Sequence, residues 1–274
     1  MATQEIIIKA GRSNRQYWKN IWRYRELFYF LAWRDLLVRY KQTVIGITWA
    51  LVRPFITMVV FTVVFGNLAQ LPSAGAPYPI LVSSALLPWQ FFADALMDCS
   101  NSLINDSNLI SKVYFPRLIV PASAVIANLV DLLVAGIILL GLMAWYNFVP
   151  GWQILTLPIF ILIAFCLTLG AGLWFAALNV QYRDFRYIVP FVVQVGLYLS
   201  PVGFSSSVVP AQWQLLYALN PMVGVINGFR WAILGGKIQL FWPGFVLSLL
   251  LVLLVLLSGI WYFRKTERKF ADVI

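Results

Sequence analysis

The stretch FWPGFVLSLLLVLLVLLSGIWYF, residues 241–263, decides what kind of protein this is. An α-helix needs about 20 predominantly apolar residues to cross the hydrocarbon core of a bilayer. This stretch is long enough and carries no charged side chain. Trp242, Trp261 and Tyr262 stand near its ends, and their amphipathic rings favour the headgroup layer. The stretch therefore predicts a transmembrane helix.

Five further stretches have the same apolar character. They are residues 44–66, 78–98, 118–146, 152–178 and 187–204. The sequence therefore predicts an all-α integral membrane protein with six transmembrane helices.

Composition supports this fold class and excludes several functions. Hydrophobic residues make up 61% of the 274 residues and charged residues 11%, whereas soluble domains carry about 25% charged residues. The net charge of +10 comes from short basic clusters between apolar runs, which argues against a nucleic-acid partner. With no histidine and no cysteine cluster, we expect no transition-metal site, and without histidine a Ser-His or Cys-His nucleophile is excluded. Cys99 and Cys166 are expected to be buried apolar residues.

Lysine and arginine predict the orientation. They are concentrated before residue 42, in two loops, and after residue 263, while Arg230 and Lys237 lie on the other side. The positive-inside rule places the concentrated side, with both termini, in the cytoplasm of a bacterial inner membrane. The polar, basic residues 1–25 predict no cleaved signal peptide.

Two segments outside the spans have apolar stretches of their own. Residues 24–43 predict an amphipathic helix in the membrane interface, so that 1–43 is a cytoplasmic and interfacial region and 44–274 the transmembrane domain. Residues 205–240 hold two stretches, each too short to cross, that meet at Asn220-Pro221. We expect a re-entrant helical hairpin there; the alternative is an amphipathic hairpin on the membrane surface.

The loop before the third span is too apolar for a solvated linker. Residues 107–117 predict a short helix, because the polar residues 105–108 can cap it and Pro116 stops it. A docking element for a cytoplasmic partner is the functional interpretation, and a membrane-surface helix is the alternative. The chain has no G-x-x-x-x-G-K-[ST] loop, so ATP-driven work requires a partner.

Charged residues inside the predicted spans are costly and need an explanation. Arg53, Asp94, Asp98 and Asp131 are of this kind. One interpretation is structural pairing, with Arg53 bound to Asp94 or Asp98 and Asp131 bound to a neighbouring helix. The other is that Arg53 contacts an anionic lipid-linked headgroup at a lateral entrance.

Aromatic residues recur in the first and fifth spans. Candidates for lining a pore, where rings offer stacking surfaces to sugars, are Trp49, Phe55, Phe61, Phe65, Phe191 and Tyr198. Packing or lipid contact is the alternative for all of them.

Several motifs together resemble one family. They are RDLLVRYKQT (34–43) with Gly46, Trp49 and Pro54; KVYFPR (112–117); NVQYRDFR (179–186); and LNP (219–221). This combination resembles the polysaccharide and O-antigen export permeases of the ATP-binding-cassette superfamily, ABC-2 type. The match runs over nearly the whole chain.

The resemblance implies a transport subunit that is not an enzyme. It implies a homodimer joined to two ATPase subunits, which bind the ATP and Mg, and a cargo of undecaprenyl-linked polysaccharide; this chain would bind no cofactor. ATP binding would push on residues 109–117 and widen a pore lined by spans one, two and five.

The resemblance also assigns roles to residues. ATPase contacts would be Leu109, Lys112, Val113, Tyr114, Phe115, Pro116, Arg117, Tyr182, Arg183, Asp184 and Arg186. The substrate entrance, in contact with membrane lipids, would be framed by Arg34, Arg39 and Lys41; Arg53 is a candidate for this entrance from its buried charge alone and not from the resemblance. The outer gate would include Leu219, Asn220 and Pro221.

Two alternatives stay open at this point. A related permease would export teichoic acid, capsule, a lipid or a drug. A membrane-embedded glycosyltransferase or polymerase would need catalytic acids, for which Asp94, Asp98 and Asp131 are the candidates within the spans.

Overall fold

The structure is a computed structural model that describes residues 14–41, 46–73, 75–267 and 270. These residues form helices and connecting turns and contain no β-strand, so the prediction of an all-α fold is confirmed. The predicted boundary between residues 43 and 44 lies outside the described residues.

The first half of the chain runs from α1 to α6. The elements are α1 (Asn14–Arg23), α2 (Arg25–Lys41), α3 (Gly46–Phe61), its π-helical continuation η1 (Thr62–Leu68), α4 (Tyr78–Asn105), α5 (Ser107–Lys112) and α6 (Ile119–Trp145).

The second half holds two long helices and several short ones. The elements are η2 (Trp152–Thr156), α7 (Leu157–Gln181), α8 (Phe185–Leu199), η3 (Ser206–Val208), α9 (Ala211–Tyr217), α10 (Pro221–Ile233) and α11 (Trp242–Thr266).

Among the described residues, five helices are long and apolar enough to cross a membrane: α3 with η1, α4, α6, η2 with α7, and α11. The predicted fifth span is shorter than expected, because α8 ends at Leu199 and residues 200–205 form a turn. Ser200 precedes Pro201, which disfavours helical backbone at Ser200 and leaves it extended. α8 therefore extends only about 22 Å.

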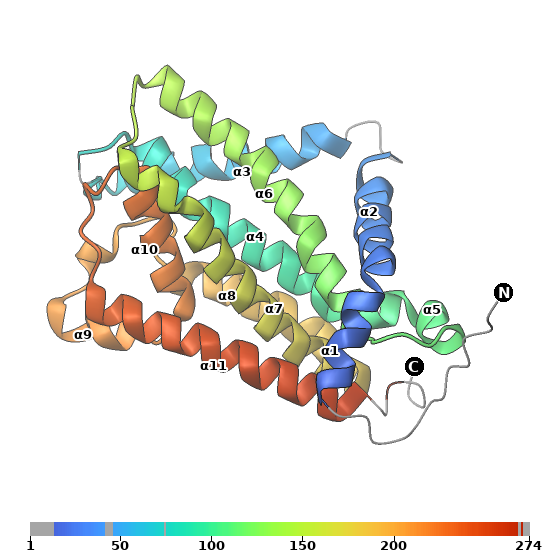
Figure 1. Ribbon diagram of the computed structural model, residues 1–274. Coiled ribbons are helices and arrows are strands. Elements are labelled where there is room, and N and C mark those ends of the chain that lie inside the picture. The colour runs from blue at the N-terminus through green and yellow to red at the C-terminus, as the bar shows by residue number, and fades with distance from the viewer. Residues whose placement is uncertain (1–13, 42–45, 74, 268–269, 271–274) are drawn as a thin grey trace.

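α4 lies at the centre of the bundle and packs against α6, α7, α10 and α3 (Figure 1). Most of its apolar residues are buried, whereas α3 leaves almost all of its described side chains at least partly exposed. α7 and α11 pack unusually closely. A Cβ on Gly259 would come within 2.3 Å of the Gly170 carbonyl oxygen, so only glycine lets the two backbones meet there.

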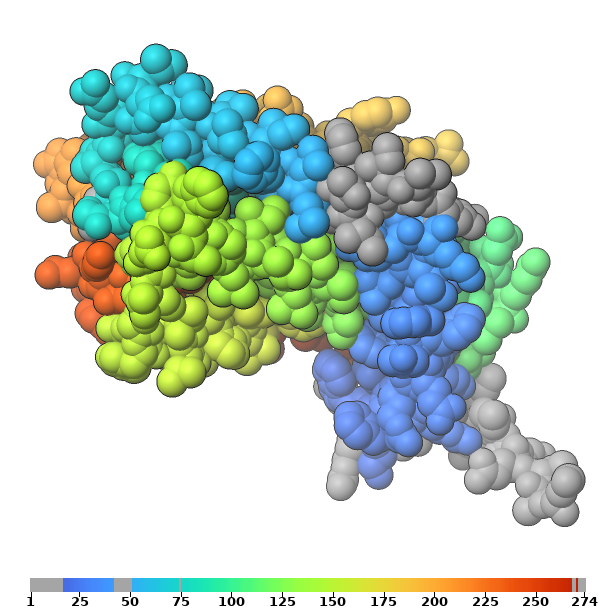
Figure 2. Space-filling model, turned by 90° about the horizontal axis from the view of Figure 1, so that it is seen from above, coloured from blue at the N-terminus to red at the C-terminus, as the bar shows by residue number. Residues whose placement is uncertain are grey.

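The bundle has two distinct ends (Figure 1). The α5 end holds α1, α5 and the last turns of α7 and α11, and the α9 end holds η1, η2, α9 and α10. Seen from above, α1 and α2 form a projecting block beside α6 (Figure 2). α2 runs across the direction of α4 and α6 rather than along it (Figure 1).

The segment between α8 and α11 contains two short helices that meet at Asn220-Pro221, as the sequence suggested. Asn220 caps α10 by accepting a hydrogen bond from the backbone N–H of Met222 at 3.1 Å. The first helix is shorter than its apolar stretch: α9 begins only after Pro210 and ends at Tyr217. Whether this pair enters the membrane stays a prediction.

Candidate functional site

The two loops with predicted ATPase contacts begin side by side at the α5 end. Asn179, near the end of α7, donates from its amide nitrogen to the carbonyl of Ser100 and to the side-chain oxygen of Asn101, both at 3.0 Å. Asn179 is buried, so these bonds fix the end of α4 against the end of α7.

The first loop differs from its prediction. α5 ends at Lys112, and Val113 has extended backbone, so the helix covers only the first half of residues 107–117. Phe115 precedes Pro116, which disfavours helical backbone at that residue. The exposed fractions of Val113 and Tyr114 are 49% and 60%, whereas Phe115 is 4% exposed. Phe115 is therefore an anchor in the core, and Tyr114 beside it faces outward.

Arg117 points into the protein. Its backbone N–H donates to Glu267 Oε1 at 3.0 Å, and its guanidinium donates to the Glu267 carbonyl. Tyr17 of α1 donates to Glu267 Oε2 at 3.0 Å. Burial raises the pKa of the Glu267 carboxyl above its usual range, although the Arg117 N–H opposes that shift. Arg117 thus joins the loop to α1 and the end of α11.

The second loop exposes its predicted contacts. Tyr182, Arg183, Asp184 and Arg186 are exposed, while Phe185 packs between Tyr182 and Phe175. The predicted contacts that are exposed in the two loops are together called the docking surface. Its members are Lys112, Val113, Tyr114, Tyr182, Arg183, Asp184 and Arg186. Leu109 and Pro116, also predicted contacts, are half-buried and buried respectively.

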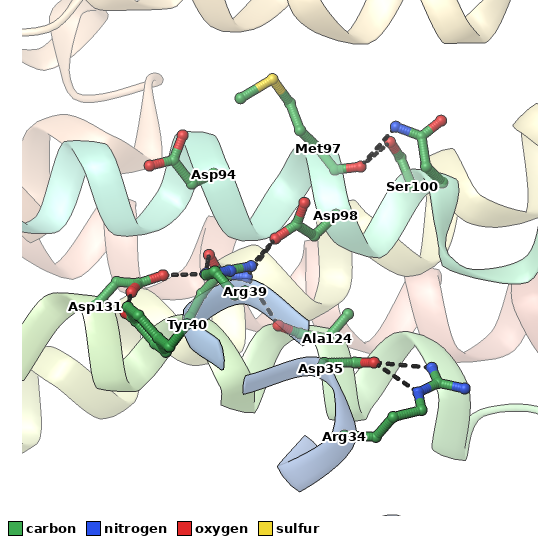
Figure 3. Close-up of polar contacts among 12 residues, drawn as sticks. Arg34, Asp35, Arg39, Tyr40, Asp94, Met97, Asp98, Ser100, Ala124 and Asp131 are labelled. Carbon is green, nitrogen blue, oxygen red and sulfur yellow. Dashed lines mark hydrogen bonds and ion pairs between the residues drawn. The ribbon is translucent and has the colours of Figure 1, made fainter. Parts of the chain in front are cut away.

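Arg39 of α2 lies at the centre of a polar cluster between the long helices (Figure 3). It donates to Asp98 of α4 at 2.5 Å and to Asp131 of α6, which also accepts from Tyr40. Asn128 of α6 accepts from Arg39 at 3.1 Å and donates to Asp98 at 2.8 Å. The prediction that Asp131 pairs with a neighbouring helix is confirmed, and the partner is Arg39, which sequence reasoning had assigned to the substrate entrance.

A second arginine ties the middle of α2 to the start of α5. Arg34 binds both carboxylate oxygens of Asp106 at 2.8 Å, and it also binds Asp35. The hydrogen bonds to Asp106 raise the pKa of Arg34, and burial raises that of Asp35. Lys41, at the end of α2, is exposed.

Arg53 donates to Asp94 Oδ1 at 3.1 Å, which confirms one of the two pairings proposed for it. Asp94 and Asp98, one turn apart on α4, therefore each have their own arginine. The Arg53 side chain is 57% exposed, so it is still able to meet a ligand.

The predicted pore aromatics separate into two groups. Phe55, Phe191 and Tyr198 are exposed, with exposed fractions between 49% and 71%. The ring centroids of Phe61 and Phe65 instead lie 5.4 Å apart, and both rings pack against Gly203. The side chain of Trp49 lies outside the described part of the chain.

The α9 end contains a functional group that sequence reasoning missed. Arg230 is 0% exposed and donates to the carbonyls of Leu81 at 3.3 Å, Val202 at 3.0 Å and Phe204 at 2.7 Å. It thereby joins α10 to α4 and to the turn after α8. Its only signal in the sequence is a single arginine within an apolar 13-residue helix. Of the predicted gate residues, Leu219 is exposed and Pro221 begins α10.

No group of three or more His, Cys, Asp or Glu side chains in the described part of the chain could hold a metal ion. The arrangement consists instead of an exposed surface, paired charges and packed helices. It suits docking and transmission of movement between helices.

The comparison with known families decides the class. The family model described as "ABC-2 type transporter" matches residues 26–234, which is most of the chain. This chain belongs to the ABC-2 type transporter family. With five helices of membrane-spanning length, it is an integral membrane protein.

Its similar curated proteins carry names from polysaccharide export. The O-antigen export system permease protein RfbA of Myxococcus xanthus is 28% identical over 214 residues, 77% of this chain and 82% of the relative. The RfbA protein of Klebsiella pneumoniae is 24% identical over 258 residues, 91% of this chain and 95% of the relative. The polysialic acid transport protein KpsM of Escherichia coli is 24% identical over 213 residues. The resemblance found in the sequence motifs is confirmed.

Proposed function

We propose that this chain is the membrane-spanning subunit of an ATP-driven exporter that moves a lipid-linked, O-antigen-like polysaccharide across the bacterial inner membrane. The observation that carries the proposal is the relationship to O-antigen export permeases over nine-tenths of both chains, within the ABC-2 family.

The docking surface supports an ATPase partner. Tyr114 and Tyr182 are each more than half exposed, yet each neighbours a residue that packs into the protein, Phe115 and Phe185. An exposed aromatic on a rigid support is typical of a protein interface. Movement of the partner would reach α1 and α11 through Arg117 and Glu267, and α2 through Asp106 and Arg34. ATP and Mg would bind to the partner.

Orientation follows from charge. The α5 end carries Lys112, Arg117, Arg183, Arg186 and Arg264, and it therefore faces the cytoplasm in this proposal. α8 would complete six crossings, with the turn at 200–205 embedded among α4 and α10. α2, which runs across the bundle, would lie at the inner interface, and α9 with α10 would form the outer hairpin.

A homodimer would place the exposed faces of α3 and α8 against each other. α3 exposes Phe55, Ile56, Val59 and Val60 although it carries the paired Arg53 in the same turns. α8 exposes aromatic residues along most of its length. Two copies facing each other across α3 and α8 would enclose a pore, while α4 stands behind them as the buried support.

Depletion of the chain in its own bacterium tests the proposal. We expect surface polysaccharide to disappear while labelled lipid-linked polymer accumulates inside, and an ATPase to copurify with the tagged chain. Loss of polymer synthesis itself, in particular in Asp94→Asn, Asp98→Asn or Asp131→Asn, would instead identify a glycosyltransferase or polymerase. Intact surface polysaccharide with accumulation of a lipid, drug or teichoic acid would identify a different cargo.

A further inference from the structure

A cavity of about 560 Å³ lies at the α9 end, between η3, α9, α10 and the first two turns of α11. Its size is typical of a small-molecule site. One wall is aromatic and includes Trp242 and Phe245. Their rings meet edge to face, with the ring centroids 6.2 Å apart. The other walls are rich in hydroxyl and amide groups. Among the residues that the structure describes, no aspartate or glutamate lines the cavity, and the one lining cation is Lys237.

Several polar groups there are built into the walls. Ser206 donates to Asn227 at 2.8 Å, which positions both beside the cavity. The Tyr217 hydroxyl is buried and has no hydrogen-bond partner in the described part of the chain. Gln239, by contrast, is exposed on the loop before α11.

This combination suits one class of ligand. A sugar ring presents hydroxyl groups around its edge and C–H groups on its face, so it needs amides and hydroxyls beside an aromatic ring. An acyl chain would cover the hydroxyl and amide groups of the walls without bonding to them, and a cationic ligand would meet Lys237 with no carboxylate among the lining residues to compensate its charge.

We propose that this cavity binds a saccharide unit of the exported polymer at the outer end of the pathway, with Trp242 as the stacking surface and Asn227 and Gln239 as hydrogen-bonding groups. The inference rests on the proposed function for the identity of the cargo. It adds a recognition site that is independent of the ATPase and of the docking surface.

Equilibrium dialysis tests this site directly. The full-length permease in nanodiscs, without ATPase or ATP, is titrated with a radiolabelled tetrasaccharide of neutral hexoses and with a sialic-acid tetrasaccharide. We expect saturable binding of at least one of them. Trp242→Ala and Gln239→Ala should each raise Kd by about three- to tenfold, the value of one stacking or hydrogen-bonding contact.

Matched controls lie on the same end of the protein. Trp213 and Gln212 on α9 are exposed and do not line the cavity, so Trp213→Ala and Gln212→Ala should leave Kd unchanged. Each exposed target residue can be replaced without removing core packing, which keeps the folded state intact.

Two results would overturn the site: no saturable binding of either saccharide, or equal effects of all four variants. Because binding is measured on the permease alone, its outcome is separate from the export experiment. Saccharide binding without export would contradict the proposed function, and export without saccharide binding would contradict only this site.

Discussion

Arg39 and Arg230 are both arginines inside a largely apolar helical protein, and they are held in opposite ways. Arg39, at the α5 end, binds the carboxylates of Asp98 and Asp131 and keeps a third of its side chain exposed. Arg230, towards the α9 end, is fully buried and binds three main-chain carbonyls.

The difference shows which part of the molecule can rearrange. Carboxylates on separate helices can exchange a shared arginine for water or another cation when the helices move. Carbonyls of a turn and a helix have fixed positions, so Arg230 binds them only while the backbone keeps its path. We expect the α5 end to transmit movement and the contacts of Arg230 to stay rigid.

The largest effect should come from Arg230→Ala. The substitution removes hydrogen bonds to three carbonyls and leaves a cavity, and each charge-assisted bond is worth about 1.5–3 kcal/mol. We expect a loss of about 5 kcal/mol or more, seen as aggregated protein in size-exclusion chromatography in detergent. Arg230→Lys, which keeps the charge but loses the planar fork, should recover only part of the monodisperse protein. A normal elution profile for Arg230→Ala would contradict the assigned role.

Phe115 and Tyr114 test whether support and docking are separate at the α5 end. Phe115→Ala should cost about 3–4 kcal/mol because it empties a buried site, and it should lower the melting temperature in detergent. Tyr114→Ala should leave the melting temperature unchanged but reduce copurified ATPase. If both variants lose stability and ATPase equally, the docking surface is wrongly assigned.

The comparison of the two arginines also shows what the sequence could and could not predict. The long spans were predictable because a run of about 20 apolar residues has few other uses. The ends of α5, α8 and α9 were misjudged, since apolar residues continue past Lys112, Leu199 and Tyr217 while the helices stop. Apolar composition there does not distinguish a helix from a turn, and it does not show which residues are buried, because Phe115 is buried whereas Tyr114 is exposed.

Paired charges were predictable only in part. The cost of burying charge predicted that Asp131 needs a partner, but not that Arg39, 92 positions away, supplies it. Arg53 and Asp94 were named as a possible pair. The same cost marked Arg230, a single arginine in an apolar helix, but its partners could not be predicted, because they are carbonyl groups, which every residue carries.

Arg39→Met should have a smaller effect, about 1–3 kcal/mol, because the cluster is partly exposed and water can replace some of its bonds. Removing the two carboxylates that are then left without Arg39, by Asp98→Asn and Asp131→Asn, should recover most of the lost stability. Lys41→Met, an exposed cation two residues later, is the matched control and should change nothing. Failure of the triple variant to recover would mean that the cluster is as rigid as the site of Arg230.

The smallest effect concerns pH and Glu267. Its folded-state pKa is raised by burial, so its protonated form is favoured in the folded protein. The stability it contributes is complete below its ordinary pKa of about 4.3 and is lost as pH rises through the raised value. Glu267→Gln keeps groups that can bond to Tyr17 and Arg117 but cannot ionise. The unsubstituted protein should therefore lose stability relative to Glu267→Gln as the pH rises. We expect the melting temperature of Glu267→Gln minus that of the unsubstituted protein to increase from pH 4 to pH 7. A constant difference would show that the carboxyl is ionised without cost, and that the junction of Arg117 with α11 tolerates charge as the Arg39 cluster does.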